Sequence, residues 1–209
     1  MNHRSLLSAA VAAAAVLSLA GPASAVVDPD DEARATIVVA ERDRAGDQRL
    51  DRDGRHAPKA VTRSVDLRRI GYRIDRTHQV ITIGYRVPRV LPSGSRYRQV
   101  FASIAATDRR ALDSAASAVF LTTSSAPSVV RVLGTTPTGE SFARRCAAAT
   151  VDVRRAQGTL VQTVPFSCFA GTAGHGYLKS VVLLETRRGD DLAWDGTPFT
   201  RDLPLTRVG

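Results

Sequence analysis

Closely spaced carboxylates early in the chain are the groups best suited to chemistry. Residues 43–47 read DRAGD and residues 51–54 read DRDG, so acids stand two to four positions apart around glycines. Hard cations such as Ca²⁺ prefer clustered oxygen ligands of this kind. The alternative is a charged loop in solvent, which the neighbouring arginines favour.

An EF-hand does not explain the same segment. A frame with Gly54 at its sixth position would need an acid at position 49 and Glu at position 60, and the chain has Arg49 and Ala60 there. Any Ca²⁺ loop here is therefore of another type.

Trp194 is the aromatic residue best placed to contact a ligand. It stands in Ala193-Trp194-Asp195-Gly196, a turn-like setting, with Tyr177 and Phe199 as candidate neighbours. A ring exposed at the surface gives a flat apolar platform with a polar edge. Trp194 and Tyr177 are thus candidate ligand-binding residues, and the alternative is that Trp194 closes the end of a core.

The sequence predicts no catalytic residue. It has no G-x-S-x-G elbow and no H-E-x-x-H pair, and the histidines after the N-terminal segment lie in predicted turns. Glu140 and Glu185 have no partner acid at a recognisable spacing. A secreted hydrolase whose groups converge only in the folded state stays open as the alternative.

Residues 1–25 have the three-part pattern of a secretory signal peptide. Arg4 precedes an apolar stretch over residues 6–20, and the segment ends with Ala23-Ser24-Ala25. The apolar stretch is short for a membrane span, and no later segment reaches that length. We therefore expect cleavage after Ala25, a secreted protein of the extracellular space or cell envelope, and no membrane span.

The cysteine count and the net charge indicate how the chain is cross-linked and which partners it could bind. Cys146 and Cys168 are the only cysteines, and in an oxidising compartment they predict one disulfide. The net charge is +9, and the excess of bases falls after residue 64. Anionic envelope polymers are the expected partners, through diffuse contacts without a shaped site, and export argues against nucleic acid. The alternative is a solvated, arginine-rich surface that only keeps the protein soluble.

Alternating apolar and polar residues predict an all-β fold. The strongest pattern is a hairpin over residues 65–74 and 79–87, with a turn between them. Residues 26–35 are expected to be flexible, 41–63 to form a loop, and 108–117 to form a short helix. Further strands are expected at residues 35–40, 99–105, 118–122, 129–133, 150–154, 159–164 and 177–186. Eight or nine strands favour one antiparallel β-sandwich over residues 36–209.

Three short motifs carry a resemblance to a known group. Asp43-x-x-Gly46-Asp47, Val65-Asp66-Leu67 and Val164-Pro165-x-x-Cys168 resemble secreted actinobacterial β-sandwich proteins of unassigned function, distantly similar to family 9 carbohydrate-binding modules. The resemblance implies a sandwich fold and a structural Ca²⁺ held by Asp43 and Asp47, with Asp66 as a third candidate ligand. The expected function is non-catalytic binding of polysaccharide or of an anionic cell-wall polymer.

Overall fold

The computed structural model describes residues 36–51, 57–106, 118–135, 141–169 and 175–204. The predicted signal peptide, the predicted flexible segment 26–35 and the predicted helix 108–117 lie outside these ranges. Within them, strands account for most of the chain and form two antiparallel sheets. The expectation of an all-β sandwich is confirmed.

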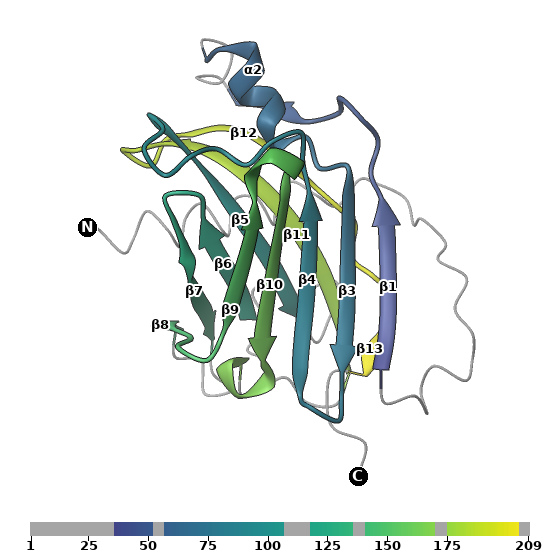
Figure 1. Cartoon of the computed structure of the whole chain (residues 1–209). Coiled ribbons are helices and arrows are strands. Elements are labelled where there is room, and N and C mark those ends of the chain that lie inside the picture. Colours follow the sequence, from purple (N-terminus) through teal and green to yellow (C-terminus); the bar gives the residue numbers. More distant parts are fainter. Residues whose placement is uncertain (1–35, 52–56, 107–117, 136–140, 170–174, 205–209) are drawn as a thin grey trace.

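The first sheet has five strands in the order β1-β3-β4-β10-β9 and is the nearer layer in Figure 1. Its strands are β1 (Thr36–Arg42), β3 (Arg69–Asp75), β4 (Val80–Arg86), β9 (Thr150–Arg154) and β10 (Thr159–Pro165). β3 and β4 form the predicted hairpin, with Gly71 opposite Gly84. β9 and β10 form a second hairpin, whose turn ends at Gly158 with φ of 62°.

The second sheet follows the order β2-β12-β11-β5-β6-β7-β8, and β13 pairs with β11 beside this path. Its strands are β2 (Arg49–Leu50), β5 (Tyr97–Ala106), β6 (Ala118–Thr123), β7 (Ala126–Thr135), β8 (Ser141–Arg145), β11 (His175–Thr186), β12 (Asp191–Gly196) and β13 (Leu203–Pro204). Short helical turns connect the strands, namely α2 (Lys59–Thr62), η3 (Arg63–Val65), η4 (Arg155–Gln157) and η5 (Phe166–Phe169).

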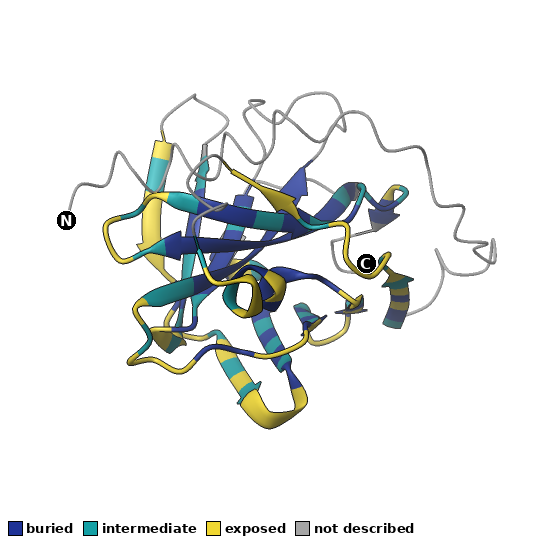
Figure 2. Cartoon of the chain, turned by 90° about the horizontal axis from the view of Figure 1, so that it is seen from above, coloured by how far each residue is buried: buried dark blue, intermediate teal, exposed yellow. Residues whose placement is uncertain are grey.

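The core lies between the sheets because side chains alternate between the two faces of each strand. Ile70, Tyr72 and Ile74 of β3 are buried, and so are Ile81, Ile83 and Tyr85 of β4. These side chains meet those of the second sheet; Tyr85, for example, packs edge-on against Phe101 of β5 with 5.4 Å between ring centroids. Figure 2 shows this alternation as bands of buried and exposed residues along the strands.

A buried polar network crosses the core between the sheets. The Tyr72 hydroxyl donates to Ser180 Oγ at 2.9 Å, and the Tyr85 hydroxyl lies 2.6 Å from Ser103 Oγ. The two serine hydroxyls are themselves 2.5 Å apart. Burial raises the pKa of both tyrosines well above the usual range, so both stay neutral hydrogen-bonding groups.

The structure corrects three expectations about elements. The predicted loop 41–63 contains β2 and the single turn α2, and the sandwich has thirteen strands among its described residues where eight or nine were expected. β8 was missed because its sequence, SFARR, is polar and its residues are mostly exposed. Trp194, expected in a turn, lies in strand β12 and pairs with Leu183.

None of the described helices has the length and hydropathy that crossing a membrane requires.

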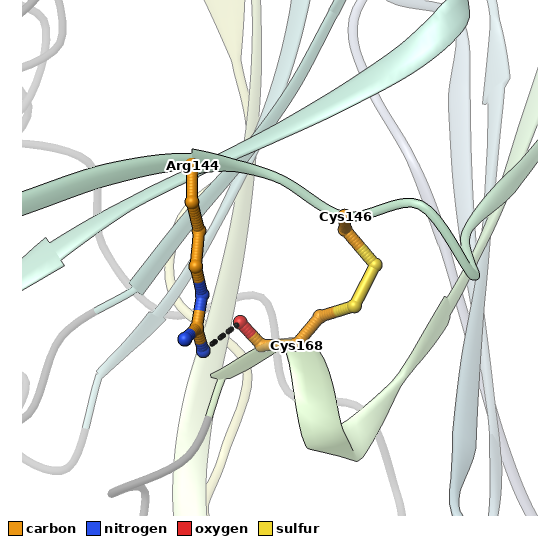
Figure 3. The surroundings of a disulfide bond; sticks show 3 residues. All are labelled: Arg144, Cys146 and Cys168. Atoms are coloured by element: carbon orange, nitrogen blue, oxygen red, sulfur yellow. Dashed lines mark hydrogen bonds between the residues drawn. A yellow bond between two sulfur atoms is a disulfide. The ribbon is translucent and has the colours of Figure 1, made fainter.

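A disulfide between Cys146 and Cys168 confirms the predicted pairing and joins the two sheets. Cys146 follows β8 of the second sheet, and Cys168 lies in η5 directly after β10 of the first. Figure 3 shows Arg144 beside the bond, where its guanidinium donates to the Cys168 carbonyl at 3.0 Å. The bond therefore fixes β9 and β10 at one edge of the sandwich.

Removing this bond with Cys146→Ala and Cys168→Ala should lower the free energy of unfolding by about 3 kcal/mol, because the loop it closes is 22 residues long. Urea denaturation monitored by tryptophan fluorescence measures the change. Reduced and alkylated wild-type protein should behave like the double variant; a denaturation curve equal to that of the oxidised wild type would contradict the prediction.

Candidate functional site

An acidic cluster forms where the two sheets meet at the end of β1. Asp43 follows β1, Asp47 lies in the loop beyond it, and Asp195 lies in β12 of the other sheet. Each offers one carboxylate oxygen, and these three oxygens lie within 4.8 Å of one another. Asp195 is buried, Asp43 is partly buried and Asp47 is exposed, so the cluster opens to solvent on one side.

Backbone amides hold the buried member of this cluster in place. Asp195 Oδ2 accepts a hydrogen bond from the Leu67 amide at 2.8 Å, and its Oδ1 accepts one from the Gly196 amide at 2.8 Å. Leu67 follows η3 and precedes β3, so this contact ties β12 to the start of the first sheet. The carboxylate is oriented before any ligand arrives.

Asp66 shapes the loop that carries the exposed acid. Its Oδ1 accepts the Gly46 amide at 2.9 Å, and its Oδ2 pairs with Arg68 at 2.6 Å. Gly46 has φ of 84°, a conformation that favours glycine, so the loop turns sharply between Asp43 and Asp47. Asp66 therefore positions the cluster through the backbone.

Several buried oxygens near the end of β1 lack a hydrogen-bond donor among the described residues. They are Glu41 Oε2, Asp43 Oδ2 and Gln48 Oε1. A buried acceptor without a donor is costly, and a bound cation satisfies it. Asp43, Asp47 and Asp195 are all oxygen ligands, so the donor set fits Ca²⁺ and these three residues would hold it.

The pKa values reflect the crowding of these acids. Burial, with the nearby charges of Asp43 and Asp47, raises the pKa of Asp195 from 3.8 to about 8. Burial and the charges of Asp47 and Asp66 raise the pKa of Asp43 to about 6. Burial first and then Asp43 raise the pKa of Glu41. Without a cation, the cluster holds protons that a cation would displace.

The structure thus brings together two of the three acids predicted as ligands, Asp43 and Asp47, and adds Asp195. Asp66 lies beside them, with both carboxylate oxygens already engaged. Sequence reasoning missed Asp195 because its partner Leu67 is 128 residues away along the chain. The available signal was an acid that closes the apolar run Leu192-Ala193-Trp194, of which Leu192 and Ala193 are buried.

The two predicted aromatic ligand residues do not form one platform. Trp194 lies on the outer face of β12, partly buried against an apolar cluster that includes Leu183, with the Arg49 guanidinium 4.9 Å from its ring. Tyr177 lies on β11, on the same outer face of the sheet as Leu183, the residue opposite Trp194. It is six residues away from Leu183 along the strand. That spacing is about 20 Å along a strand, too far for one sugar ring to touch both.

A groove crosses the outer face of the first sheet, which Figure 1 views from outside. We call it the sheet groove; it has a volume of about 540 Å³. Its floor is the cross-strand row Ala40, Gly71, Gly84 and Val161. The two glycines create the depression, because a Cβ added at either would meet no atom closer than 4.0 Å.

Different chemistry borders the two sides of this floor. On one side the register aligns Arg42, Arg69, Arg86 and Thr159. On the other side it aligns Val38, Arg73, Thr82 and Thr163, and Val38 is 68% exposed. In the part of the chain that the structure describes, the groove is lined by arginines, threonines, glycines, tyrosines and aliphatic residues, and none of these lining residues is Asp, Glu, His, Cys or Ser.

Comparison of the chain with protein-family models, with curated proteins and with solved structures finds no match.

Excess Ca²⁺ should raise the melting temperature of the wild-type protein. At about 100 times Kd, binding to the folded state alone stabilises it by about 2.7 kcal/mol, or roughly 5–10 °C for a chain of this size. Asp47→Asn should abolish the rise, and Asp152→Asn, at an exposed acid of β9, should keep it. Differential scanning calorimetry with Ca²⁺, Mg²⁺ and chelator makes the comparison; an equal response in both variants would rule out the assigned ligands.

In chelator, the raised pKa values of Asp43 and Asp195 should make stability fall as pH rises. Below about pH 4 both carboxyls are protonated in either state, whereas between pH 4 and 8 the unfolded chain releases protons that the folded chain retains. The stabilisation is thus fully present below pH 4 and lost by about pH 8. Urea midpoints across this range test it, with Asp195→Asn expected to flatten the slope.

Proposed function

We propose that this chain is an exported, non-catalytic binding protein that holds a polymer chain across the outer face of its first sheet. The observation that carries the proposal is the sheet groove, a depression of about 540 Å³ that two facing glycines open in an otherwise continuous strand surface. The predicted signal peptide and the disulfide support export.

The shape of the groove suits an extended ligand. Its floor runs across four neighbouring strands, from Ala40 in β1 to Val161 in β10, and is made of small or apolar side chains. Hydrophobic and small residues accept the flat face of a sugar ring, and the polar rows beside them supply hydrogen bonds at its edges. The floor therefore offers several subsites in a line.

Binding explains the groove better than hydrolysis does. Glycoside hydrolysis uses two carboxyl groups on either side of the bond that is cleaved, and none of the described residues that line the groove carries a carboxylate. Asp43 and Asp195, the two acids of the cluster whose pKa values are raised, are not among the lining residues. They are better used to hold a cation.

A Ca²⁺ ion in the acidic cluster would support the same function indirectly. Asp43 directly follows β1, which is the edge strand of the sheet that carries the groove, and Asp195 belongs to the other sheet. Bridging them with one ion fixes this edge against the body of the sandwich. The role is structural, and it leaves the groove itself unchanged.

Filling the floor should weaken binding strongly without unfolding the protein. Gly71→Val together with Gly84→Val places two β-branched side chains where only open space exists, in strands that favour such residues. The Kd for purified bacterial cell wall should rise at least about tenfold, a loss of about 1.4 kcal/mol of binding free energy.

Ala143→Val is the matched control, since it adds a similar side chain at an exposed position of β8 in the other sheet. Circular dichroism and the melting temperature establish that both variants fold. Equal retention of the filled variant and the control would place binding elsewhere on the molecule and overturn the proposal.

A further inference from the structure

We infer that the polymer held in the sheet groove is an acidic polysaccharide that carries a carboxylate on its sugars, with these carboxylates bound by a row of arginines along one side. The inference rests on the proposed function and goes further by naming the ligand class. We define the arginine row as Arg42, Arg69 and Arg86, which the strand register places directly opposite one another.

The arginine row is unfavourable for the protein alone. Like charges that face each other across neighbouring strands destabilise a sheet, and here three of them stand side by side on β1, β3 and β4. Within the described part of the chain, no hydrogen bond or ion pair engages the side chains of Arg42 or Arg69. All three side chains are exposed, so their charges are available to a ligand.

Neighbouring contacts define where the charged row ends. The Arg86 guanidinium donates to Thr159 Oγ1 at 3.0 Å, which holds it along the groove. Beyond Thr159, Arg154 of the edge strand β9 pairs with Asp152 at 2.9 Å and is already neutralised in part. The unneutralised charge therefore covers β1, β3 and β4.

The opposite side of the floor has hydroxyl groups as well as charge. Thr82 and Thr163 stand opposite each other on β4 and β10, with 3.4 Å between their hydroxyl oxygens. Arg73 of β3 adds one cation in this row, and Val38 of β1 adds an exposed apolar side chain. A sugar with a carboxylate at one edge and hydroxyls at the other matches this asymmetry.

The spacing of the row favours a charge that repeats with each sugar. Neighbouring strands lie about 4.8 Å apart, so the arginines repeat at about this interval across the sheet. One sugar of an extended polysaccharide advances by a comparable length. Arginine binds carboxylates through two parallel hydrogen bonds, and the flat floor suits rings more than it suits a flexible phosphodiester chain.

Polygalacturonate fragments and their fully methyl-esterified form provide matched probes, because they share one backbone and differ only at the carboxyl group, which is charged in the acid and a neutral methyl ester in the other. Wild-type protein should bind the acid form at least about tenfold more tightly than the ester at low salt, and the difference should shrink as salt rises, since the contacts are exposed. Isothermal titration calorimetry measures both ligands.

Arg69→Gln with Arg86→Gln should remove most of the preference for the acid form. Arg145→Gln with Arg188→Gln is the control, because it lowers the net charge equally at exposed positions of β8 and of the turn after β11. The control should keep the wild-type preference. A loss of preference in both double variants would mean that net charge, and not the arginine row, selects the ligand.

The remaining outcomes separate this inference from the proposed function. Equal binding of acid and ester, lost in the variant with Gly71→Val and Gly84→Val, would keep the groove as the binding site and overturn the acidic ligand. Tighter binding of poly(glycerol phosphate) than of polygalacturonate would overturn the carboxylate assignment. No binding of any probe or of cell wall would overturn both.

Discussion

The pairing of β3 with β4 determines both faces of the first sheet, and through its inner face the contact with the second sheet. Both strands contain the tripeptide Gly-Tyr-Arg, at residues 71–73 and 84–86, and their register sets one glycine opposite the other. Because side chains alternate, each glycine faces outward while the next residue, a tyrosine, faces the core. A shift of one residue in this pairing would reverse one strand relative to the other and turn its tyrosine to solvent, onto the groove floor. One register thus sets the outer surface and the inner contacts together.

The inward tyrosines also position the second sheet. A buried hydroxyl without a partner would cost about 1–3 kcal/mol, and the serines of β5 and β11 supply the partners for Tyr72 and Tyr85. Apolar packing alone tolerates sliding of one sheet over the other, whereas these hydrogen bonds are satisfied in only one alignment. The disulfide and the contact from Asp195 to the Leu67 amide fix the alignment at two other places. The groove floor is therefore backed by a rigid layer.

Local pattern was sufficient for some features and not for others. The hairpin of β3 and β4 and the disulfide were predicted because alternation and a single cysteine pair are visible within short stretches of sequence. The arginine row was not, since Arg42, Arg69 and Arg86 belong to strands whose pairing the sequence does not state, and separate arginines had suggested only diffuse contacts. Asp195 was missed for the same reason. Trp194 was assigned to a turn because Asp195 and Gly196, which are common in turns, follow it, although both belong to the short strand β12.

The direction of the groove relative to the strands has a consequence for how the protein would occupy a long ligand. It runs across the sheet toward the edge strands β1 and β9, beyond which no described strand of this sheet continues. A chain longer than the sheet can therefore continue past both edges, so that recognition needs no chain terminus. Many copies can then line up along one strand of polymer, and a copy that detaches finds equivalent sites within reach, which slows its escape from a dense matrix far more than one contact would.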